Sequence, residues 1–415
     1  MPSLLSDRCS CPGPPHVDLT EAYIAQHQAS SQPPPESLRD CERSLLSNLK
    51  EHGWSHVTVR LSDLPQGSPL VVSSADDAMK DAKFQWKNPK ESILRLFDDS
   101  ALIPNATYRT SESGAPGESS VEPKKSWESR RCTSYNNNNQ NDEQSEASPL
   151  DSVTNALHSI ICTVNWLLHL PPNLLIAQRQ DTPGTPTRHQ YGCFCNKHQD
   201  GCNSHGPCNL DLLRVFHYDK VEPPKNQNDA IMGSSPHTDW GSFTVVWQDT
   251  VGGLQTYCRT CQAWRDVEAS FDDNLLRFVI HVGDATSLAM NCGRELLGDG
   301  EHPSSPFFPS PKHRVLSPVT ETRVSLVYFV YPSPGQSLES LASGVASWLE
   351  TDQGKRGGAH AKTPSHGHIP YEHYYLLHDQ SESNRNRLPK DVYLEICKRS
   401  MEQVFAEKWT QVQRS

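Results

Sequence analysis

The sequence predicts a mainly β fold with flanking helices. Between Leu212 and Tyr331, short runs rich in Val, Phe, Thr and Trp are separated by Gly and Asp, which is typical of antiparallel β structure. The 415-residue chain has a hydrophobic fraction of 35% and 32 prolines, a composition that fits a loop-rich globular protein better than a helical bundle. Helical periodicity lies mainly before and after the β region. We therefore expect one globular unit with long insertions.

The segment before the β region contains short helices and a strand. Leu spacing from Cys41 to Lys50 predicts an amphipathic helix, which Gly53 ends before the alternating strand Trp54–Val59. A second helix is expected over Lys80–Phe97, where Pro89 should interrupt it.

The next stretch changes from disorder to helix. Residues near 110–148 are rich in Ser, Glu, Gly, Asn and Gln, which cannot bury enough apolar surface to offset ordering entropy, so a disordered insertion is predicted. Ser148-Pro149-Leu150-Asp151 then has the N-cap, N1 proline and acidic first turn of a helix that Pro171-Pro172 should end.

Two helices are expected after the β region, around Leu338 to Leu349 and from Pro389 to Trp409, packed against the outside of the sheet. The expected division is a helical and strand region over 1–208, a β core over 209–335 and a C-terminal helical extension over 336–415.

Charge and composition argue against several partners. The net charge is −11 and no basic stripe interleaved with aromatics occurs, so no nucleic-acid partner is expected. The start lacks a charged and apolar leader, and no stretch approaches the roughly 20 apolar residues that span a bilayer. We expect a cytoplasmic protein without a membrane partner, whose 13 cysteines are reduced.

A candidate metal site begins with His237-Thr238-Asp239. In a strand, residues i and i+2 point the same way, so His237 and Asp239 can reach one ion. Two imidazoles and one carboxylate on one face of an octahedron leave three positions open for O₂ chemistry. The pattern alone is weak, since it recurs at His16, His198 and His217, where a solvated surface pair is the alternative.

The context of His237 is specific. His237–Gly241 is followed by an alternating strand and then by Gly252-Gly253-Leu254-Gln255, an order that resembles the 2-oxoglutarate and Fe(II)-dependent dioxygenases of the isopenicillin-N-synthase-like class. Arg277–Asp284 is similar to the family strand that ends in Asn-x-Gly-Asp. Here His281 replaces the Asn; it could compete as a ligand, but the position is structural in the family.

The resemblance extends to a third ligand and an anion site. His313-Arg314-Val315 matches the distal histidine motif, so His237, Asp239 and His313 are the implied iron ligands and catalytic residues. Arg323 and Ser325 lie on one face of a strand, where guanidinium and hydroxyl can clamp a carboxylate. Their match to the family's Arg-x-Ser implies the 2-oxoglutarate site.

Tyr218 matches a family tyrosine that contacts the co-substrate, although a half-buried strand residue is an equal alternative. The spacing from His237 to His313 is longer than usual in the family, and we assign the excess to a loop insertion over Gly293–Lys312.

The resemblance implies a double-stranded β-helix, a distorted jelly roll, and an enzyme that uses Fe(II), 2-oxoglutarate as co-substrate and, optionally, ascorbate. It would hydroxylate, desaturate or cyclise a small organic metabolite with O₂ through a ferryl intermediate, releasing succinate and CO₂. We expect a monomer. Two alternatives remain: an iron oxidase of this fold that does not use 2-oxoglutarate, and a non-catalytic interaction protein.

A second metal site is weighed at the cysteines. The soft ligands between 193 and 208 are Cys193, Cys195, Cys202 and Cys208, with His198 and His205 nearby. Cys258-x-x-Cys261 adds a pair, which should lie at a hairpin tip before the returning strand Trp264–Val267. Structural zinc is one interpretation and reduced loop thiols are the other.

Overall fold

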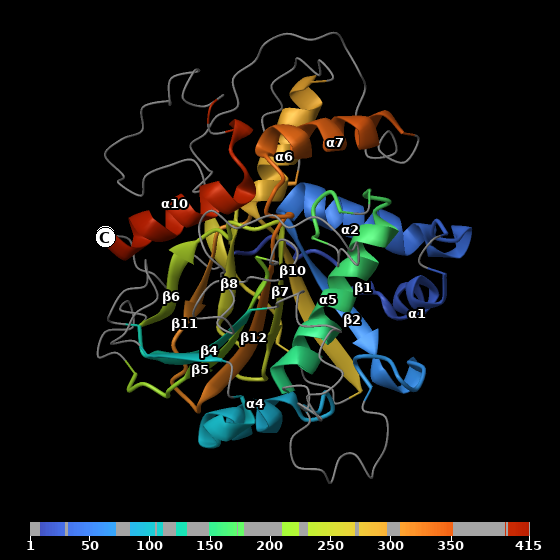
Figure 1. The fold of residues 1–415 in the computed structure, drawn as a ribbon. Coiled ribbons are helices and arrows are strands. Elements are labelled where there is room, and N and C mark those ends of the chain that lie inside the picture. Colours follow the sequence, from blue (N-terminus) through green and yellow to red (C-terminus); the bar gives the residue numbers. More distant parts are fainter. Residues whose placement is uncertain are drawn as a thin grey trace, which may run out of the picture.

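Two β-sheets form the centre of the molecule (Figure 1). The computed structural model describes residues 9–29, 32–71, 84–103, 106–110, 122–130, 149–171, 173–177, 210–223, 231–269, 274–296, 308–351, 395 and 397–414. The large sheet, in spatial order, consists of β1 (Val17–Asp18), β2 (Trp54–Arg60), β10 (Leu275–Val282), β7 (Phe243–Gln248), β12 (Arg323–Val330), β5 (Leu212–Tyr218), β4 (Lys124–Arg130) and β3 (Thr107–Thr110). The small sheet consists of β6 (Met232–His237), β11 (His313–Leu316), β8 (Leu254–Cys258) and β9 (Ala263–Asp266).

From β5 to β12 the chain crosses repeatedly between the two sheets. Strands β5, β7, β10 and β12 belong to the large sheet, while β6, β8 with its hairpin partner β9, and β11 belong to the small one. All strand pairs in this part are antiparallel. This alternation is the double-stranded β-helix, so the expected fold is confirmed.

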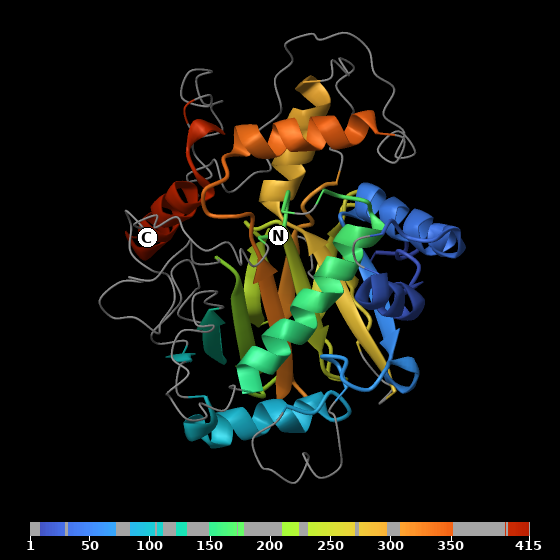
Figure 2. The ribbon, with the colours of Figure 1, turned by 45° about the vertical axis from the view of Figure 1, so that its right-hand side comes forward.

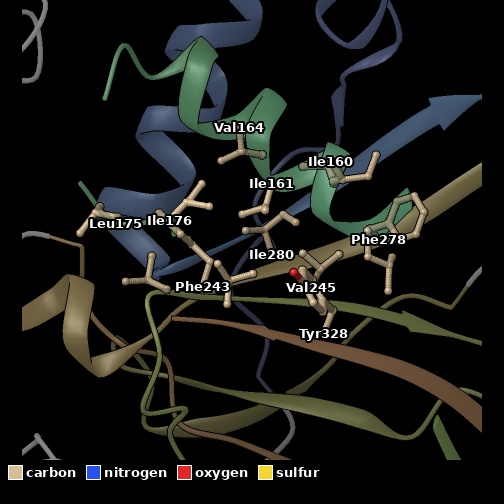
Figure 3. Packing of buried hydrophobic residues seen from close by; sticks show 14 of the residues in the cluster. Ile160, Ile161, Val164, Leu175, Ile176, Phe243, Val245, Phe278, Ile280 and Tyr328 are labelled. Atoms are coloured by element: carbon tan, nitrogen blue, oxygen red, sulfur yellow. The ribbon is translucent and has the colours of Figure 1, made fainter. Parts of the chain in front are cut away.

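The two faces of the large sheet bury different side chains. On β12, Val324, Leu326 and Tyr328 point outward into the main core, which the helices cover. Figure 3 shows Ile161 and Val164 of the covering helix α5 (Pro149–Leu167) close to this outer face. The face between the sheets has a smaller apolar cluster, which leaves room there for polar side chains. Its members are Trp54, Phe216, Tyr218, Val246, Leu254, Val267, Val279 and Val315.

The helices lie around this sandwich (Figure 2). Helices α1 (Thr20–Ala29), α2 (Arg39–His52) and α5 contribute buried side chains to the main core on the outer face of the large sheet. Helix α4 (Pro89–Asp98) lies below the sheets, while α6 (Asp284–Leu296) and α7 (Leu338–Glu350) lie above them, and α10 (Met401–Arg414) lies to one side. No described helix is both long and apolar enough to cross a bilayer.

Several predicted helices and turns are confirmed. Helix α2 ends at Gly53, whose φ of 75° is the left-handed C-cap expected of glycine, and β2 follows at once. Helix α7 begins at the predicted place and has a capping box between Ser337 and Ser340. The hairpin of β8 and β9 has Cys258 and Cys261 at its tip, also as predicted.

Pro89 was assigned the wrong role. It does not interrupt a helix but is the first residue of α4, because a proline at N1 loses no helical hydrogen bond. Helix α7 was also placed wrongly, since it packs mainly against α6 rather than against the outside of the sheet. Helix α6 itself was not predicted, and its residues include Gly293, which we had assigned to a loop insertion.

The predicted disordered insertion near 110–148 contains an ordered strand. Lys124–Arg130 forms β4, which pairs along its whole length with β5. The strand escaped prediction because its inward side chains are charged: the buried Lys124 pairs with Glu122 at 2.9 Å, and Glu128 pairs with Arg214 at 2.5 Å. Residues 111–121 and 131–148 lie outside the described part of the chain.

Candidate metal centre

Three potential metal ligands meet where β6 ends and β11 begins. His237 is the last residue of β6, His313 is the first of β11, and the two lie opposite each other in the antiparallel register. Asp239 follows in the next loop, with Oδ1 at 3.8 Å from His237 Nε2 and 3.7 Å from His313 Nε2. The three ligand atoms all lie within 4.8 Å of one another. Two segments distant in sequence thus supply one site.

Each histidine is oriented by the backbone. His237 Nδ1 lies 2.7 Å from the carbonyl oxygen of Ser235, and His313 Nδ1 lies 3.1 Å from that of Pro311. An Nδ1–H that donates to a carbonyl fixes the tautomer in which Nε2 carries the free lone pair. Both Nε2 atoms therefore face Asp239 as metal donors.

The charges of these residues suit a cation. Burial and the neighbouring His313 lower the pKa of His237 to about 4, even though 42% of its side chain is exposed. Burial also lowers the pKa of His313, so both imidazoles are neutral at neutral pH. Burial alone would raise the pKa of Asp239, but His313, His281 and His237 hold it well below its usual range. The site thus combines two neutral donors with one carboxylate.

The polar environment of Asp239 fits a bound metal. The residue is 4% exposed, and its Oδ2 has no hydrogen-bond partner among the described residues. A buried ionised carboxylate without partners is costly, whereas a cation between Asp239 and the two histidines would compensate its charge. Two imidazoles and one carboxylate are the ligand set of non-haem Fe(II) sites. The donor set therefore fits Fe(II).

The backbone after Asp239 requires glycine at two contacting positions. A Cβ added to Gly283 would lie 2.0 Å from the carbonyl oxygen of Gly241, so no larger residue fits. Asp284 N donates to the carbonyl oxygen of Asp239 at 2.7 Å, and the Asp284 carboxylate accepts from the Thr238 hydroxyl at 3.1 Å. The start of α6 thereby holds the loop that carries Asp239.

His281 lies behind the three ligands. It is fully buried on β10, its Nδ1 is 3.8 Å from Asp239 Oδ2, and its ring centroid is 4.5 Å from that of His313. Neither ring nitrogen has a hydrogen-bond partner among the described residues. The position of His281 on a strand agrees with the structural role, and its distance from Asp239 shows why competition as a ligand had to be weighed.

The His-x-Asp pairs at His16 and His217 do not gather ligands in the described part of the chain. His16 stacks on His56, with ring centroids 4.5 Å apart, and pairs with Glu268 at 2.8 Å. His217 Nδ1 lies 3.5 Å from Asp219, and its ring is 5.0 Å from that of Phe97. Neither belongs to a group of three potential ligands in the described part of the chain. His198 and the 193–208 cysteine cluster lie outside the described residues.

A buried arginine lies on the inner face of β12. Arg323 is 1% exposed, and no described carboxylate lies within ion-pair distance of its guanidinium. Its Nη1 donates to Ser325 Oγ and its Nη2 to Gln248 Oε1, each at 3.2 Å, while Nε donates to the carbonyl oxygen of Gly252. These bonds use three of the five N–H donors. A buried guanidinium that has unused donors and no counter-ion among the described residues indicates an anion-binding position.

Tyr218 supports this guanidinium through its ring. The Arg323 guanidinium carbon lies 4.7 Å from the ring centroid, a cation–π distance, and the two residues are opposite each other in the register of β5 and β12. The Tyr218 ring is also close to β6, because a Cβ added to Gly233 of that strand would lie 2.9 Å from the ring. Tyr218 is thus buried between the anion position and the strand that ends in His237.

The sequence analysis missed the charged residues in β4 and in the segment just before it. Glu122 Oε1 accepts from the backbone N–H and hydroxyl of Ser235, at 2.7 and 2.6 Å, two residues before His237. Lys124, opposite Tyr218 in the register, acts on the charge of His237 by lowering its pKa. No motif marks these residues, so only the strand pairing reveals them.

Part of the chain is similar in sequence to known proteins. Residues 210–332 match the family profile of the 2OG-Fe(II) oxygenase superfamily. Over 131 residues the chain is 31% identical to gibberellin 2-beta-dioxygenase of Phaseolus coccineus, covering 32% of this chain and 34% of the relative. It is 30% identical over 139 residues to the 2-oxoglutarate-Fe(II) type oxidoreductase ppzD of Metarhizium majus, covering 32% and 35%.

These matches span about a third of the length of the curated relatives. Among solved structures, the chain is similar to the dioxygenase for auxin oxidation in rice, with 16% identity, a TM-score of 0.41, and coverage of 76% of this chain and 82% of that one.

Proposed function

We propose that this protein is an enzyme that couples Fe(II), 2-oxoglutarate and O₂ to the oxidation of a small organic molecule, because residues 210–332 match the family profile of the 2OG-Fe(II) oxygenase superfamily. The products would be a hydroxylated or desaturated compound, succinate and CO₂. The observation that carries the proposal is the buried Arg323, which has no carboxylate partner among the described residues, in the same fold as the convergent ligands His237, Asp239 and His313.

The three ligands would hold Fe(II) through two neutral nitrogens and one carboxylate. Iron bound there supplies redox chemistry with O₂ that no side chain can perform. The carbonyl oxygens of Ser235 and Pro311 keep the two Nε2 atoms aimed at the ion. Asp239 reduces the net positive charge of the site, and its own loop is fixed by the start of α6.

Arg323 would bind the distal carboxylate of 2-oxoglutarate. Two N–H groups remain after its hydrogen bonds to other described residues, enough for a bidentate contact, and Ser325 adds a hydroxyl beside them. The Tyr218 ring and the carbonyl oxygen of Gly252 hold the guanidinium plane in place. The apolar cluster between the sheets, which includes Val246 and Val279, limits water around this contact.

The substrate class is inferred from the relatives and from the charge of the chain. Relatives are named as gibberellin oxidases and as an ortho-hydroxylase of coumaroyl CoA and feruloyl CoA, which supports a small organic substrate here. A net charge of −11 disfavours nucleic acid as substrate. The cysteines of the described segments form no disulfide, which supports a location in the reducing cytoplasm, where we expect a monomer.

The test is the anaerobic reconstitution of the full chain with Fe(II), followed by addition of O₂, 2-oxoglutarate and a metabolite mixture. Mass spectrometry should detect succinate together with products that gain one oxygen or lose two hydrogens. His237→Ala and Asp239→Ala should abolish succinate formation, whereas His16→Ala, which changes a His-x-Asp pair outside the site, should not. Undiminished succinate formation in either ligand variant would show that the iron site is wrongly assigned. Substrate oxidation without succinate would instead identify an oxidase that omits 2-oxoglutarate.

A further inference from the structure

Four cysteines from two distant segments converge at the edge of the small sheet. Cys9 and Cys11 belong to the N-terminal segment, and Cys258 and Cys261 flank the turn between β8 and β9. Their sulfur atoms all lie within 4.8 Å of one another, and those of Cys9 and Cys261 are 3.2 Å apart. Four sulfurs at about 2.3 Å from a central zinc ion would be about 3.8 Å apart, so the cluster is already close to that arrangement.

The turn after Cys258 directs backbone N–H groups at the sulfur of this residue. Burial opposes ionisation, but hydrogen bonds from the backbone N–H groups of Cys261 and Thr260, and from the Cys261 and Cys9 thiols, lower the pKa of Cys258 to about 6. Amides of a Cys-x-x-Cys turn that point at the first sulfur stabilise its negative charge. Hydrogen bonds from this turn thus converge on Cys258 Sγ, which lies close to the other three sulfurs.

A cation lies beside the cluster. Arg265 Nη2 is 3.0 Å from Cys9 Sγ, 3.8 Å from Cys258 Sγ and 3.0 Å from the carbonyl oxygen of Cys11. A divalent ion with four thiolates carries a net charge of 2−, and a guanidinium that donates to two of the sulfurs offsets part of it. The hydrogen bonds around the sulfurs thus match the needs of a tetrathiolate centre.

We propose that Cys9, Cys11, Cys258 and Cys261 form a structural zinc site, distinct from the proposed iron centre. Zn²⁺ would displace the remaining thiol protons and leave no open coordination position, because all four ligands come from the protein. Four soft thiolates in a closed tetrahedron suit Zn²⁺, and a site without an open position would be structural rather than catalytic. A disulfide is the competing product, but none of these four cysteines forms one among the described residues.

The site would fasten the N-terminal segment to an exposed sheet edge. β9 is an edge strand of the small sheet, and the Cys9 N–H donates to the Trp264 carbonyl oxygen at 3.0 Å. The same hairpin supports the strand that carries His313, since Thr256 lies opposite His313 in the register. The ring of Trp264 also lies 4.1 Å from the guanidinium of Arg314. Zinc would stabilise this edge of the small sheet without contacting the substrate.

Cobalt substitution tests the proposal in the full-length, reduced protein. Co²⁺ in the cysteine cluster should give intense thiolate-to-cobalt charge-transfer absorption and the visible bands of a tetrahedral ion. Co²⁺ at His237, Asp239 and His313 has no sulfur ligand and gives no such charge-transfer band. Elemental analysis should also find one zinc per chain that a thiol-modifying reagent releases. Neither the cobalt spectrum nor the zinc content depends on catalysis, so both test the zinc site independently of the proposed oxygenase activity.

Matched variants identify the ligands. Cys258→Ser/Cys261→Ser should lose the charge-transfer band and weaken zinc binding by more than roughly 100-fold, beyond the usual effect of outer-shell changes. Cys41→Ser, which changes a free cysteine outside the cluster, should retain both. If the hairpin variant does not fold, Cys9→Ser/Cys11→Ser supplies the same test from the N-terminal segment. The absence of the band in the reduced wild-type protein, its persistence in the variants, or a Cys9–Cys261 disulfide under reducing purification would overturn the proposal.

Discussion

Replacing Arg323 by alanine should weaken the binding of 2-oxoglutarate by about 100-fold or more and leave metal binding intact. The guanidinium is 1% exposed and has two N–H groups free after its three hydrogen bonds to other described residues. Charge-assisted hydrogen bonds contribute about 1.5–3 kcal/mol each, so a bidentate contact contributes about 3 kcal/mol at the lower limit. Since about 1.4 kcal/mol corresponds to a tenfold change in Kd, the loss exceeds ~100-fold.

Anaerobic calorimetric titration of 2-oxoglutarate into the Fe(II)-loaded protein measures this loss directly. Arg323→Lys is the matched control: it keeps the charge but not the planar fork, so its affinity should lie between those of the wild type and Arg323→Ala. Fe(II) binding measured in parallel should be unchanged, because Arg323 donates only to Gly252, Ser325 and Gln248 among the described residues. A Kd within threefold of the wild type in Arg323→Ala would refute the assignment of the co-substrate site.

Three further outcomes are expected. Gly283→Ala should prevent folding or lower the free energy of unfolding far more than Gly335→Ala does in urea titrations. A Cβ at Gly283 would lie 2.0 Å from the Gly241 carbonyl oxygen, whereas nothing lies within 4 Å of a Cβ at Gly335. Equal stability of the two variants would contradict the close approach of Gly283 to Gly241. His281→Ala should weaken Fe(II) binding about tenfold, because its ring packs 4.5 Å from that of His313 and supports this ligand; unchanged affinity in a metal titration would remove that role. Burial lowers the pKa of His56 to about 4, below its unfolded value near 6.5, so the metal-free protein should lose stability as pH falls through this interval; a flat profile in thermal unfolding would contradict this.

The parts of the fold that sequence predicts are those with short-range signals. The Gly53 cap and the start of α7 at Leu338 depend on neighbouring residues, and both were found where expected. β4 depends instead on partners elsewhere in the chain, since Glu128 is neutralised by Arg214 of β5 and by Arg109 of β3. Charged residues in a strand look like loop until those partners are known.

The same limit applies to the sites. His313 and Arg323 could be selected from many histidines and arginines because the motifs that contain them follow His237 in a fixed order. The cysteine pairs carry no such order, and we grouped Cys258 with the 193–208 cysteines that precede it in sequence. The structure pairs it with Cys9, about 250 residues away, through an edge contact that no local pattern encodes.

The pairing of β6 with β11 makes the metal centre a reporter of strand register. His237 and His313 face each other across two antiparallel strands, with register irregularities between His313 and Leu316. Side chains alternate along a strand, so a slip of one residue would turn one histidine to the opposite face and destroy the ligand set. Metal would then bind tightly only to correctly aligned chains. The catalytic metal would therefore also favour the native pairing of β6 with β11 during folding.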